Sequence, residues 1–364
     1  MDKFIMVGCD LHDRTMLLKM AEDQGKARVR RWSNDRSSRQ KMIEDLRCRA
    51  RLAGGARIVF AYEASGSGFV LHDELTASGI ECHVLAPTLI ERSSKHRRRK
   101  TDERDAQRVL DILRAHLLAG IDLPSVWVPD RQTRDDRELV RRRLNVAENR
   151  SAVKTQIRWL LKRNAIDKSM APASPWTCEY WCWLHDLSEA HLSRGAAMGL
   201  ASLLRQLDWL SREIELLDKE VLTLAGADRY AGPVAALRAY KGVGLLTAMV
   251  FLTELGDLSR FSNRQEVGSF LGLTPGSQES GEADDRKGHI THQGPSRVRK
   301  VLCQAVWSRL GSVVSEQTAY QRLVARNPKH KKIAVVARMR TMAIWMWHAG
   351  LAAQQRLKVA PTAA

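Results

Sequence analysis

The first 90 residues alternate short apolar runs with amphipathic stretches. Residues 4–12 are an apolar run that ends in polar residues, and two further strand patterns meet at a turn at Gly25. Residues 37–53 have a helical pattern, and strand, helix and strand patterns follow over residues 56–87. Three consecutive strands followed by helix, strand, helix and strand predict an α/β layer built on a mixed sheet.

From about residue 131 the strand pattern stops and helical periodicity replaces it. Residues 132–166 predict one long, strongly basic helix. In the helix that follows, apolar residues recur at alternating spacings of three and four, at Leu200, Leu203, Leu207, Leu210, Ile214, Leu217, Val221 and Leu224. This spacing favours a helical hairpin or an intermolecular coiled coil over a single amphipathic helix packed inside a domain.

These patterns divide the chain into three domains and a tail. Residues 1–128 form the α/β domain, whose element order is that of an RNase H-like fold. Residues 129–228 form a helical coiled-coil segment that links or oligomerises. Residues 229–356 form a mainly α-helical domain, and residues 357–364 are a tail.

The third domain opens with two helices joined by the turn Lys241-Gly242-Val243-Gly244. This order predicts a helix–hairpin–helix, in which Lys241, Gly242 and Gly244 contact nucleic-acid phosphates because glycine lets backbone amides approach them. The alternative is an ordinary pair of helices that uses glycine in its turn. A glycine- and charge-rich loop over residues 272–296 follows, and then basic helices.

Charge narrows the class of partner. The chain has 59 lysines and arginines against 41 acids, a formal net charge of +18. Such an excess favours a polyanionic partner. Since no run of eighteen apolar residues and no signal sequence is present, nucleic acid is favoured over a membrane, and a cytoplasmic, nucleoid-associated location is expected.

The cysteines suggest one alternative site. The chain has six scattered cysteines, which we expect to be reduced thiols. Cys178, Cys182 and His185 lie close enough in sequence to suggest zinc, but their spacing fits no common finger. Packing of the surrounding aromatic residues is the better interpretation.

Four acids stand at positions where chemistry is expected. Asp10 follows the first strand, Glu63 ends the strand "IVFAYE", and Asp102 and Asp105 lie three apart at the start of a helix. Taken singly, each acid has a structural explanation as a cap or an ion-pair partner. Together, carboxylates that converge from strand ends and a helix need a divalent cation between them, and oxygen ligands suit Mg²⁺ or Mn²⁺.

At this point the sequence resembles a known family. The segments "GCDLH", "AYEASG" and "KTDERDA" are similar to the DEDD tetrad of the RuvC-like insertion-sequence transposases of the IS one-ten family, which act as RNA-guided recombinases. The segment from "YKGVGLL" to "RVRKVL", with its "GLTP" turn and Ser-Gly pair, resembles the second transposase domain of that family. The resemblance covers most of the chain, with both sets of motifs in the family's order.

The resemblance implies roles for particular residues. Asp10, Glu63, Asp102 and Asp105 would bind Mg²⁺ or Mn²⁺, and Ser280 would attack a DNA phosphodiester to form a phosphoserine link. Without the family, Ser280 is an ordinary loop serine, and Ser277 competes with it. The chain has Gly294-Pro295 where the family commonly has Gly-Asn, so any role of that asparagine is absent or moved.

Basic residues near both motif sets are candidates for holding phosphates, although each has the alternative of a solvated surface charge. They are Arg92, Lys95, Arg97, Arg98, Arg99, Lys100, Arg286, Lys287, Arg297 and Arg299.

Three functions compete on these observations. The first is a transposase-recombinase that acts on double-stranded DNA through a serine intermediate, guided by a structured RNA as the family implies. The second is a RuvC-like junction-resolving endonuclease that uses water. The third is a non-enzymatic coiled-coil protein that binds nucleic acid. The coiled-coil seam suggests a homodimer, and synapsis of two duplexes suggests a tetramer.

Overall fold

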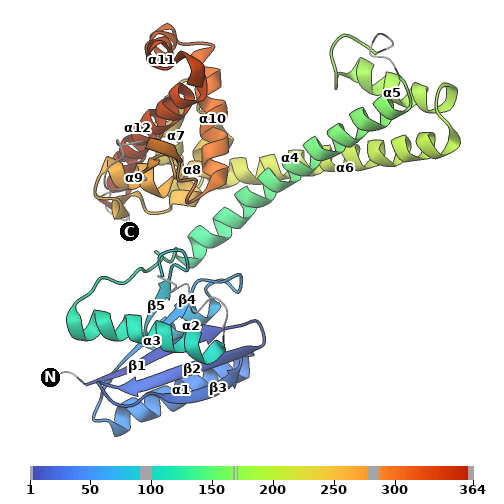
Figure 1. The fold of residues 1–364 in the computed structure, drawn as a ribbon. Helices are drawn as coiled ribbons and strands as arrows, with labels where there is room; N and C mark the ends of the chain where they lie inside the picture. Colours follow the sequence, from blue (N-terminus) through green and yellow to red (C-terminus); the bar gives the residue numbers. More distant parts are fainter. Residues whose placement is uncertain (1–2, 91–100, 167–168, 170, 278–286, 360–364) are drawn as a thin grey trace. The chain divides into compact units, whose positions relative to one another are not determined.

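The computed structural model describes residues 3–90, 101–166, 169, 171–277 and 287–359, shown in Figure 1. The chain divides into two compact units, residues 1–128 and residues 129–364. The finer division at residues 228/229 stays a prediction, and the last described helix continues to Val359.

The first unit is built on a five-stranded sheet in the order β3-β2-β1-β4-β5. Strand β1 (Phe4–Leu11) pairs antiparallel with β2 (Thr15–Glu22), which pairs antiparallel with β3 (Arg28–Ser33). On the other side β1 pairs in parallel with β4 (Arg57–Glu63), and β4 with β5 (Glu81–Leu85). The predicted mixed sheet is therefore confirmed, and its form is consistent with a RuvC-like domain.

Helices cover both faces of this sheet. Helices α1 (Arg36–Leu52) and α2 (Val70–Ala77) pack on the face that carries Val7 and Cys9 of β1. Helix α3 (Asp102–Ala119) packs on the face that carries Met6. Because a strand buried on both faces has no polar side, β1 appears in the sequence as a continuous apolar run.

The described part of the second unit is helical except for one short strand pair. Strands β6 (Pro275–Ser277) and β7 (Lys287–Ile290) pair antiparallel within the segment predicted as a loop. The helices are α4 (Arg131–Arg163), α5 (Cys178–Ala190), α6 (Arg194–Ala225), α7 (Asp228–Arg238), α8 (Leu245–Leu255), η3 (Leu258–Arg260), α9 (Arg264–Phe270), α10 (Ser296–Leu310), α11 (Val314–Arg326), η4 (Pro328–His330) and α12 (Lys331–Val359). No described helix is long and apolar enough to span a lipid bilayer.

Helices α4 and α6 lie side by side over much of their length (Figure 1). Leu207, Leu210 and Ile214 of the predicted seam are buried in the core that the two helices share with α5. Arg143 of α4 adds a bidentate ion pair to Asp218 of α6, with distances of 2.8 and 2.9 Å. The seam therefore has a partner within the chain, while coiled-coil geometry and oligomerisation stay predictions.

A second helical core surrounds α8. Every residue of α8 from Ala248 to Leu255 is buried, against apolar residues of α7, α10 and α12. The turn before α8 approaches α10 closely, since a Cβ at Gly242 would lie 2.5 Å from the carbonyl oxygen of Ala305. Gly242 has a φ of 97°, which favours glycine as well. Packing thus explains Gly242, and the helix–hairpin–helix function stays a prediction.

Candidate metal centre

The ends of two parallel strands bring the first two acids to one edge of the sheet. Cys9 of β1 pairs with Tyr62 of β4, and Asp10 and Glu63 are the next residues of these strands. Cys9 and Tyr62 point into the core beneath α1 and α2. Since side chains alternate along a strand, Asp10 and Glu63 belong to the opposite face, on which α3 packs.

Helix α3 carries the other two acids in its first turn. Asp102 and Asp105 precede a buried stripe formed by Ala106, Val109 and Leu113. That stripe packs on the face of the sheet to which Asp10 belongs. Glu103, which lies off this face, pairs with Arg31 of β3 at 3.8 Å. The helix therefore directs its first and fourth residues toward the strand ends.

Gly8 allows α3 to approach β1 this closely. A Cβ at Gly8 would overlap the backbone nitrogen of Leu110 and lie 2.5 Å from the carbonyl oxygen of Ala106. A single glycine inside a strand often marks such an approach of another backbone. Gly8 stands two residues before Asp10, so the contact that it permits also sets the separation between Asp10 and the start of α3.

Three side chains converge at this edge. Ligand atoms of Asp10, His12 and Asp102 all lie within 4.8 Å of one another. The Nε2 atom of His12 is 3.0 Å from Oδ2 of Asp10 and 3.6 Å from Oδ1 of Asp102. The Asp10 side chain is only 16% exposed, whereas Asp102 is 57% exposed. The centre is thus shielded from solvent at Asp10 and open to solvent at Asp102.

The electrostatics of Asp10 reflect this crowding. Burial raises the pKa of Asp10, the charge and hydrogen bond of His12 oppose the rise, and the charges of Asp102 and Asp105 add to it. A divalent cation would remove that repulsion, and carboxylate oxygens with an imidazole nitrogen form a donor set that such a cation accepts. The residues present therefore fit a divalent metal ion.

Two comparisons with known proteins bear on this arrangement. The profile of a DEDD transposase domain of the IS110 type matches residues 7–165, and the profile described as Transposase IS116/IS110/IS902 family matches residues 234–321. The chain belongs to the IS110 family of transposases. Transposases cleave DNA and transfer its strands, so the protein is an enzyme that acts on DNA, and the non-enzymatic interpretation is set aside.

Relatives of similar length support the assignment. The predicted transposase y4qE of Sinorhizobium fredii is 29% identical over 377 residues, covering 96% of this chain and 89% of the relative. The transposase for insertion sequence element IS1533 of Leptospira borgpetersenii is 25% identical over 317 residues, covering 84% of this chain and 86% of the relative.

Of the tetrad predicted for the transposase, Asp10 and Asp102 belong to the three-residue cluster. Glu63 is placed beside Asp10 by strand register, and Asp105 contributes to the electrostatics of Asp10 while its Oδ1 lies 3.7 Å from Arg108. The role of all four as ligands stays a prediction. His12 was not predicted. The available signal was its position two residues after Asp10, since alternate residues of a strand share a face.

A hollow of about 470 Å³ adjoins the cluster. It is lined by residues 11–15 of the turn between β1 and β2 and by residues 65–67 after β4. The two segments are linked by a hydrogen bond of 3.3 Å from Oγ of Ser67 to Oδ1 of Asp13. Since His12 lines this hollow, it offers space for a substrate beside the candidate ligands.

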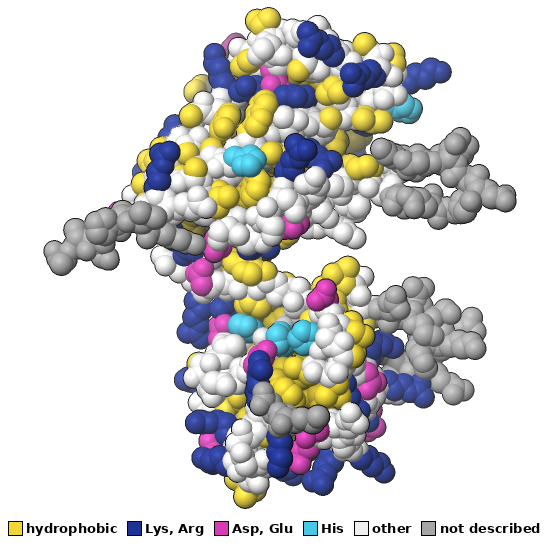
Figure 2. Space-filling model, turned by 90° about the vertical axis from the view of Figure 1, so that its left-hand side faces the viewer, with side chains coloured by type: hydrophobic (Ala, Val, Ile, Leu, Met, Phe, Trp, Pro, Cys, Tyr) yellow, Lys and Arg dark blue, Asp and Glu magenta, His cyan; other side chains and the backbone are white. Residues whose placement is uncertain are grey.

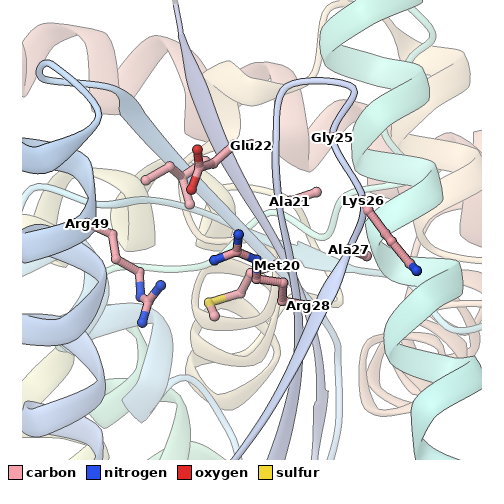
Figure 3. A pocket seen from close by; sticks show the side chains of 9 residues that line it. Met20, Ala21, Glu22, Gly25, Lys26, Ala27, Arg28 and Arg49 are labelled. Carbon is pink, nitrogen blue, oxygen red and sulfur yellow. The ribbon is translucent and has the colours of Figure 1, made fainter.

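Another hollow, of about 440 Å³, lies at the opposite ends of the strands (Figure 3). Lys26, Arg28 and Arg49 line it together with Glu22. Arg49 is bound to Asp45 of its own helix at 2.8 Å. Because Ile5 at the start of β1 lines this hollow, it is separated from Asp10 by most of that strand and contains none of the tetrad.

The loop that carries the predicted nucleophile is closed at its base. Ser280 and Arg286 lie outside the described residues, between β6 and β7. Gly272 and Gly294, with φ of 62° and 72°, press against the carbonyl oxygens of Gln293 and Phe270, so that a Cβ at either position would overlap them. We call this contact the glycine neck. Gly294 thus has a packing role, and Pro295, the residue that departs from the family pattern, follows it directly.

The predicted phosphate-binding residues have varied surroundings. Arg299 donates from Nη1 to the carbonyl oxygens of Leu271, Gln293 and Gly294, at 3.1, 2.9 and 3.3 Å, and so braces the glycine neck. Burial lowers the pKa of Arg299. Arg297 donates to Oδ1 of Asn145 at 3.3 Å. Both are engaged within the protein, and their contacts to nucleic acid stay predictions.

The remaining candidates lie partly within and partly outside the described residues. Lys241 is exposed, and its carbonyl oxygen accepts from Arg309 at 3.2 Å. Gly244 directly precedes α8, and Lys287 begins β7. Outside the described residues lie Arg92, Lys95, Arg97, Arg98, Arg99 and Lys100. On the face seen in Figure 2, lysines and arginines are spread over both units.

The suggested zinc group does not form among the described residues. Cys178 and Cys182 are exposed free thiols, and the ring of His185 lies 5.6 Å from that of Trp181. Tyr180 and Leu184, from the same helix, are buried in the core shared with α4 and α6. The packing interpretation therefore accounts for this segment.

Proposed function

We propose that this transposase cuts and rejoins DNA strands with a divalent-metal centre in its first unit and Ser280 as nucleophile, and that a structured RNA encoded by its element directs it. The convergence of Asp10, His12 and Asp102 at the carboxyl end of β1 carries the proposal. Acids at this edge of the sheet occupy the positions at which the motifs of the family were identified.

Asp10, Glu63, Asp102 and Asp105 would hold Mg²⁺ or Mn²⁺. When bound, the ion supplies Lewis-acid stabilisation of the charge that develops on phosphoryl oxygens. The recessed Asp10 would fix the ion against the sheet, while the open side at Asp102 would leave room for the phosphodiester. The adjoining hollow of about 470 Å³ would take the sugar next to it.

Ser280 would provide the attacking oxygen. A bond from its Oγ to phosphorus would form as the bond from phosphorus to a deoxyribose oxygen breaks. The serine gives up its proton, and the leaving oxygen takes one up. Because one phosphate ester replaces another, the energy of the bond is retained, and the reverse reaction with a different strand end joins DNA without an external energy source.

The excess of basic residues would hold the nucleic acids through their phosphates. Base pairing with the RNA would select the site, while the protein recognises backbone and shape. We further propose that the transposase acts as a homodimer that forms a tetramer at synapsis, in the cytoplasm on the nucleoid.

The decisive experiment is a search for a covalent protein–DNA adduct. The protein, cognate DNA, the RNA and Mg²⁺ are incubated, and adducts are resolved by denaturing electrophoresis. We compare Ser280→Ala with Ser277→Ala, a matched serine of the same segment, and with Asp102→Asn. We expect the adduct to disappear in Ser280→Ala and Asp102→Asn and to persist in Ser277→Ala.

Other outcomes identify the alternatives. Cleavage that persists in Ser280→Ala without an adduct would indicate an endonuclease that uses water. Loss of the adduct only in Ser277→Ala would make that residue the nucleophile. Asp102→Asn should retain most DNA affinity at fixed salt, since phosphate contacts dominate binding.

RNA guidance and assembly need separate measurements. Leaving out the RNA should abolish site-specific adducts, and a reaction of equal efficiency without RNA contradicts guidance. Sedimentation of the protein alone and with paired DNA ends should give a dimer and then a tetramer.

A further inference from the structure

We propose that His12 is a ligand of the divalent metal, so that the centre contains one nitrogen donor among its carboxylate oxygens. This inference rests on the proposed metal centre and adds a residue outside the DEDD tetrad. It also predicts which metal the centre prefers.

The geometry of the His12 ring carries the inference. Its Nε2 atom lies 3.0 Å from Oδ2 of Asp10 and 3.6 Å from Oδ1 of Asp102, so one ring atom faces two carboxylates from different elements. Ligands in adjacent positions of an octahedron, each about 2.1 Å from the ion, lie about 3 Å apart. The His12 and Asp10 atoms are therefore spaced as neighbouring ligands of one ion are, and Oδ1 of Asp102 lies within about 0.6 Å of that spacing from the ring nitrogen.

The backbone of His12 is held in place from both sides. Its N–H donates to the carbonyl oxygen of Thr15 at 2.9 Å, and its carbonyl oxygen accepts from Nδ2 of Asn34 at 2.8 Å. Asn34 is fixed in turn by Arg39, whose Nη1 donates to Oδ1 of Asn34 at 3.1 Å. Arg39 makes a bidentate pair with Glu74, at 2.7 and 2.9 Å.

This network restricts the backbone of His12 more than the backbone of an ordinary exposed turn residue is restricted. Arg39 and Glu74 are only 13% and 22% exposed, so the pair that anchors Asn34 is largely shielded from water. A backbone held on both sides narrows the range of positions that the His12 ring can take. The turn between β1 and β2 therefore presents His12 to the carboxylates from a fixed backbone.

A nitrogen donor changes the preference among metals. Oxygen ligands suit Mg²⁺, whereas imidazole suits transition metals. We therefore expect the wild-type centre to favour Mn²⁺ over Mg²⁺ by a larger factor than His12→Asp, which replaces the nitrogen by oxygen. Removing a ligand should weaken Mn²⁺ binding by at least the roughly 10- to 100-fold that changes to supporting residues cause.

The test is electron-spin-echo spectroscopy of Mn²⁺ bound to the full chain, with affinities from calorimetry. Nitrogen modulation from a coordinated imidazole is expected in the wild type and absent in His12→Asn. His83→Asn is the matched control, because Nε2 of His83 is also 3.0 Å from a carboxylate two residues away, that of Glu81. The control should keep both the modulation and the affinity, and circular dichroism melting verifies that each variant is folded.

The outcomes separate this inference from the proposed metal centre. If Mn²⁺ binding depends on Asp10 but shows no nitrogen modulation, the role of His12 is overturned and the proposed metal centre is retained. Modulation that persists in His12→Asn also overturns it. Failure of the wild type to bind Mn²⁺, or binding unaffected by Asp10→Asn, overturns the centre and the inference together. Loss of the modulation and weaker binding only in His12→Asn supports both.

Discussion

The recessed acid Asp10 of the first unit and the recessed acids Glu254 and Glu316 of the second unit have opposite surroundings. In the second unit, Glu254 is 4% exposed and receives a bidentate pair from Arg141, at 2.7 and 2.8 Å. Glu316 is 5% exposed and pairs with Arg309 and Arg338. In the first unit, Asp10 is paired among the described residues with His12 alone and faces Asp102.

The pKa shifts follow this difference. Burial opposes ionisation of Glu316, but hydrogen bonds from Arg338 and Arg309 outweigh it and lower its pKa. Burial raises the pKa of Asp10, and neighbouring carboxylates reinforce the rise. A recessed acid that the protein neutralises with arginine stabilises the fold. A recessed acid that lies beside other side chains able to ligate a metal is suited to bind a cation from solution.

The largest expected effect is on activity. Asp102→Asn should reduce strand cleavage by at least about 1000-fold, or about 4 kcal/mol, because it removes a proposed ligand of the ion that stabilises the developing charge. Thermal stability without metal should not fall, since the change removes a repulsive charge. Glu103→Gln, in the same helical turn but paired with Arg31, should cleave at the wild-type rate. Equal losses in both variants would contradict the assignment.

The next effect is on stability. Glu254 also lies 3.9 Å from Nε of Arg137. Glu254→Gln should lower the free energy of unfolding by about 3–5 kcal/mol, because it leaves Arg137 and Arg141 partly buried without their anionic partner. The unfolding transition of the second unit in urea measures this free energy. The control Asp208→Asn breaks a pair with Arg212 that is 47% and 75% exposed, and should cost less than about 1 kcal/mol. Similar costs in both variants would refute the distinction between buried and surface pairs.

Packing links the fold of the first unit to its metal centre. Gly8→Ala should cost about 1–3 kcal/mol, because its Cβ would press α3 away from β1. Mn²⁺ affinity measured by calorimetry should fall as Asp102 moves away from Asp10. Gly195→Ala, where a Cβ meets nothing within 4 Å, should leave both quantities unchanged or slightly raise the stability. A loss of stability with undiminished affinity would show that α3 does not set the spacing.

The smallest effect concerns an acid that caps a helix. Asp130 precedes α4 and accepts from Thr133 and Arg229. Burial opposes its ionisation, but these bonds lower its pKa from 3.8 to about 2. Asp130→Ala should cost about 1 kcal/mol, a value limited by the 58% exposure of the side chain.

The dependence on pH follows from the direction of that shift. Because the pKa is lower in the folded state, the contribution of Asp130 is complete above pH 4 and is lost as the pH falls toward 2. Urea denaturation at several pH values should therefore show the gap between wild type and Asp130→Ala narrowing below pH 4. A stability difference that widens below pH 4 would contradict the predicted direction of the pKa shift.

Much of the first unit could be predicted from local patterns. The succession of strands and helices followed from apolar runs and turns, whereas the pairing of the strands did not. The positions of the four acids at strand and helix ends followed from the same patterns. His12 and Gly8 could not be assigned in the same way. Their significance depends on how closely α3 approaches β1, which no local pattern specifies.

The second unit shows where periodicity alone is insufficient. The seam was assigned with Leu203, which is half-buried, whereas its neighbour Leu204 is buried. The partner helix and the angle of packing decide which of two adjacent leucines faces inward. The strands β6 and β7 were missed because they have only 3 and 4 residues, too few to show an alternating apolar pattern.

The glycine neck has a consequence in terms of chain entropy. Gly272 and Gly294 are already held together in the folded unit. The entropic cost of closing the segment between them is therefore part of the free energy of folding and not of the activation free energy of the reaction. Doubling the length of a closed segment costs only about 0.6 kcal/mol. A change in the number of residues between Gly272 and Gly294 should therefore have little effect on the free energy of the described fold.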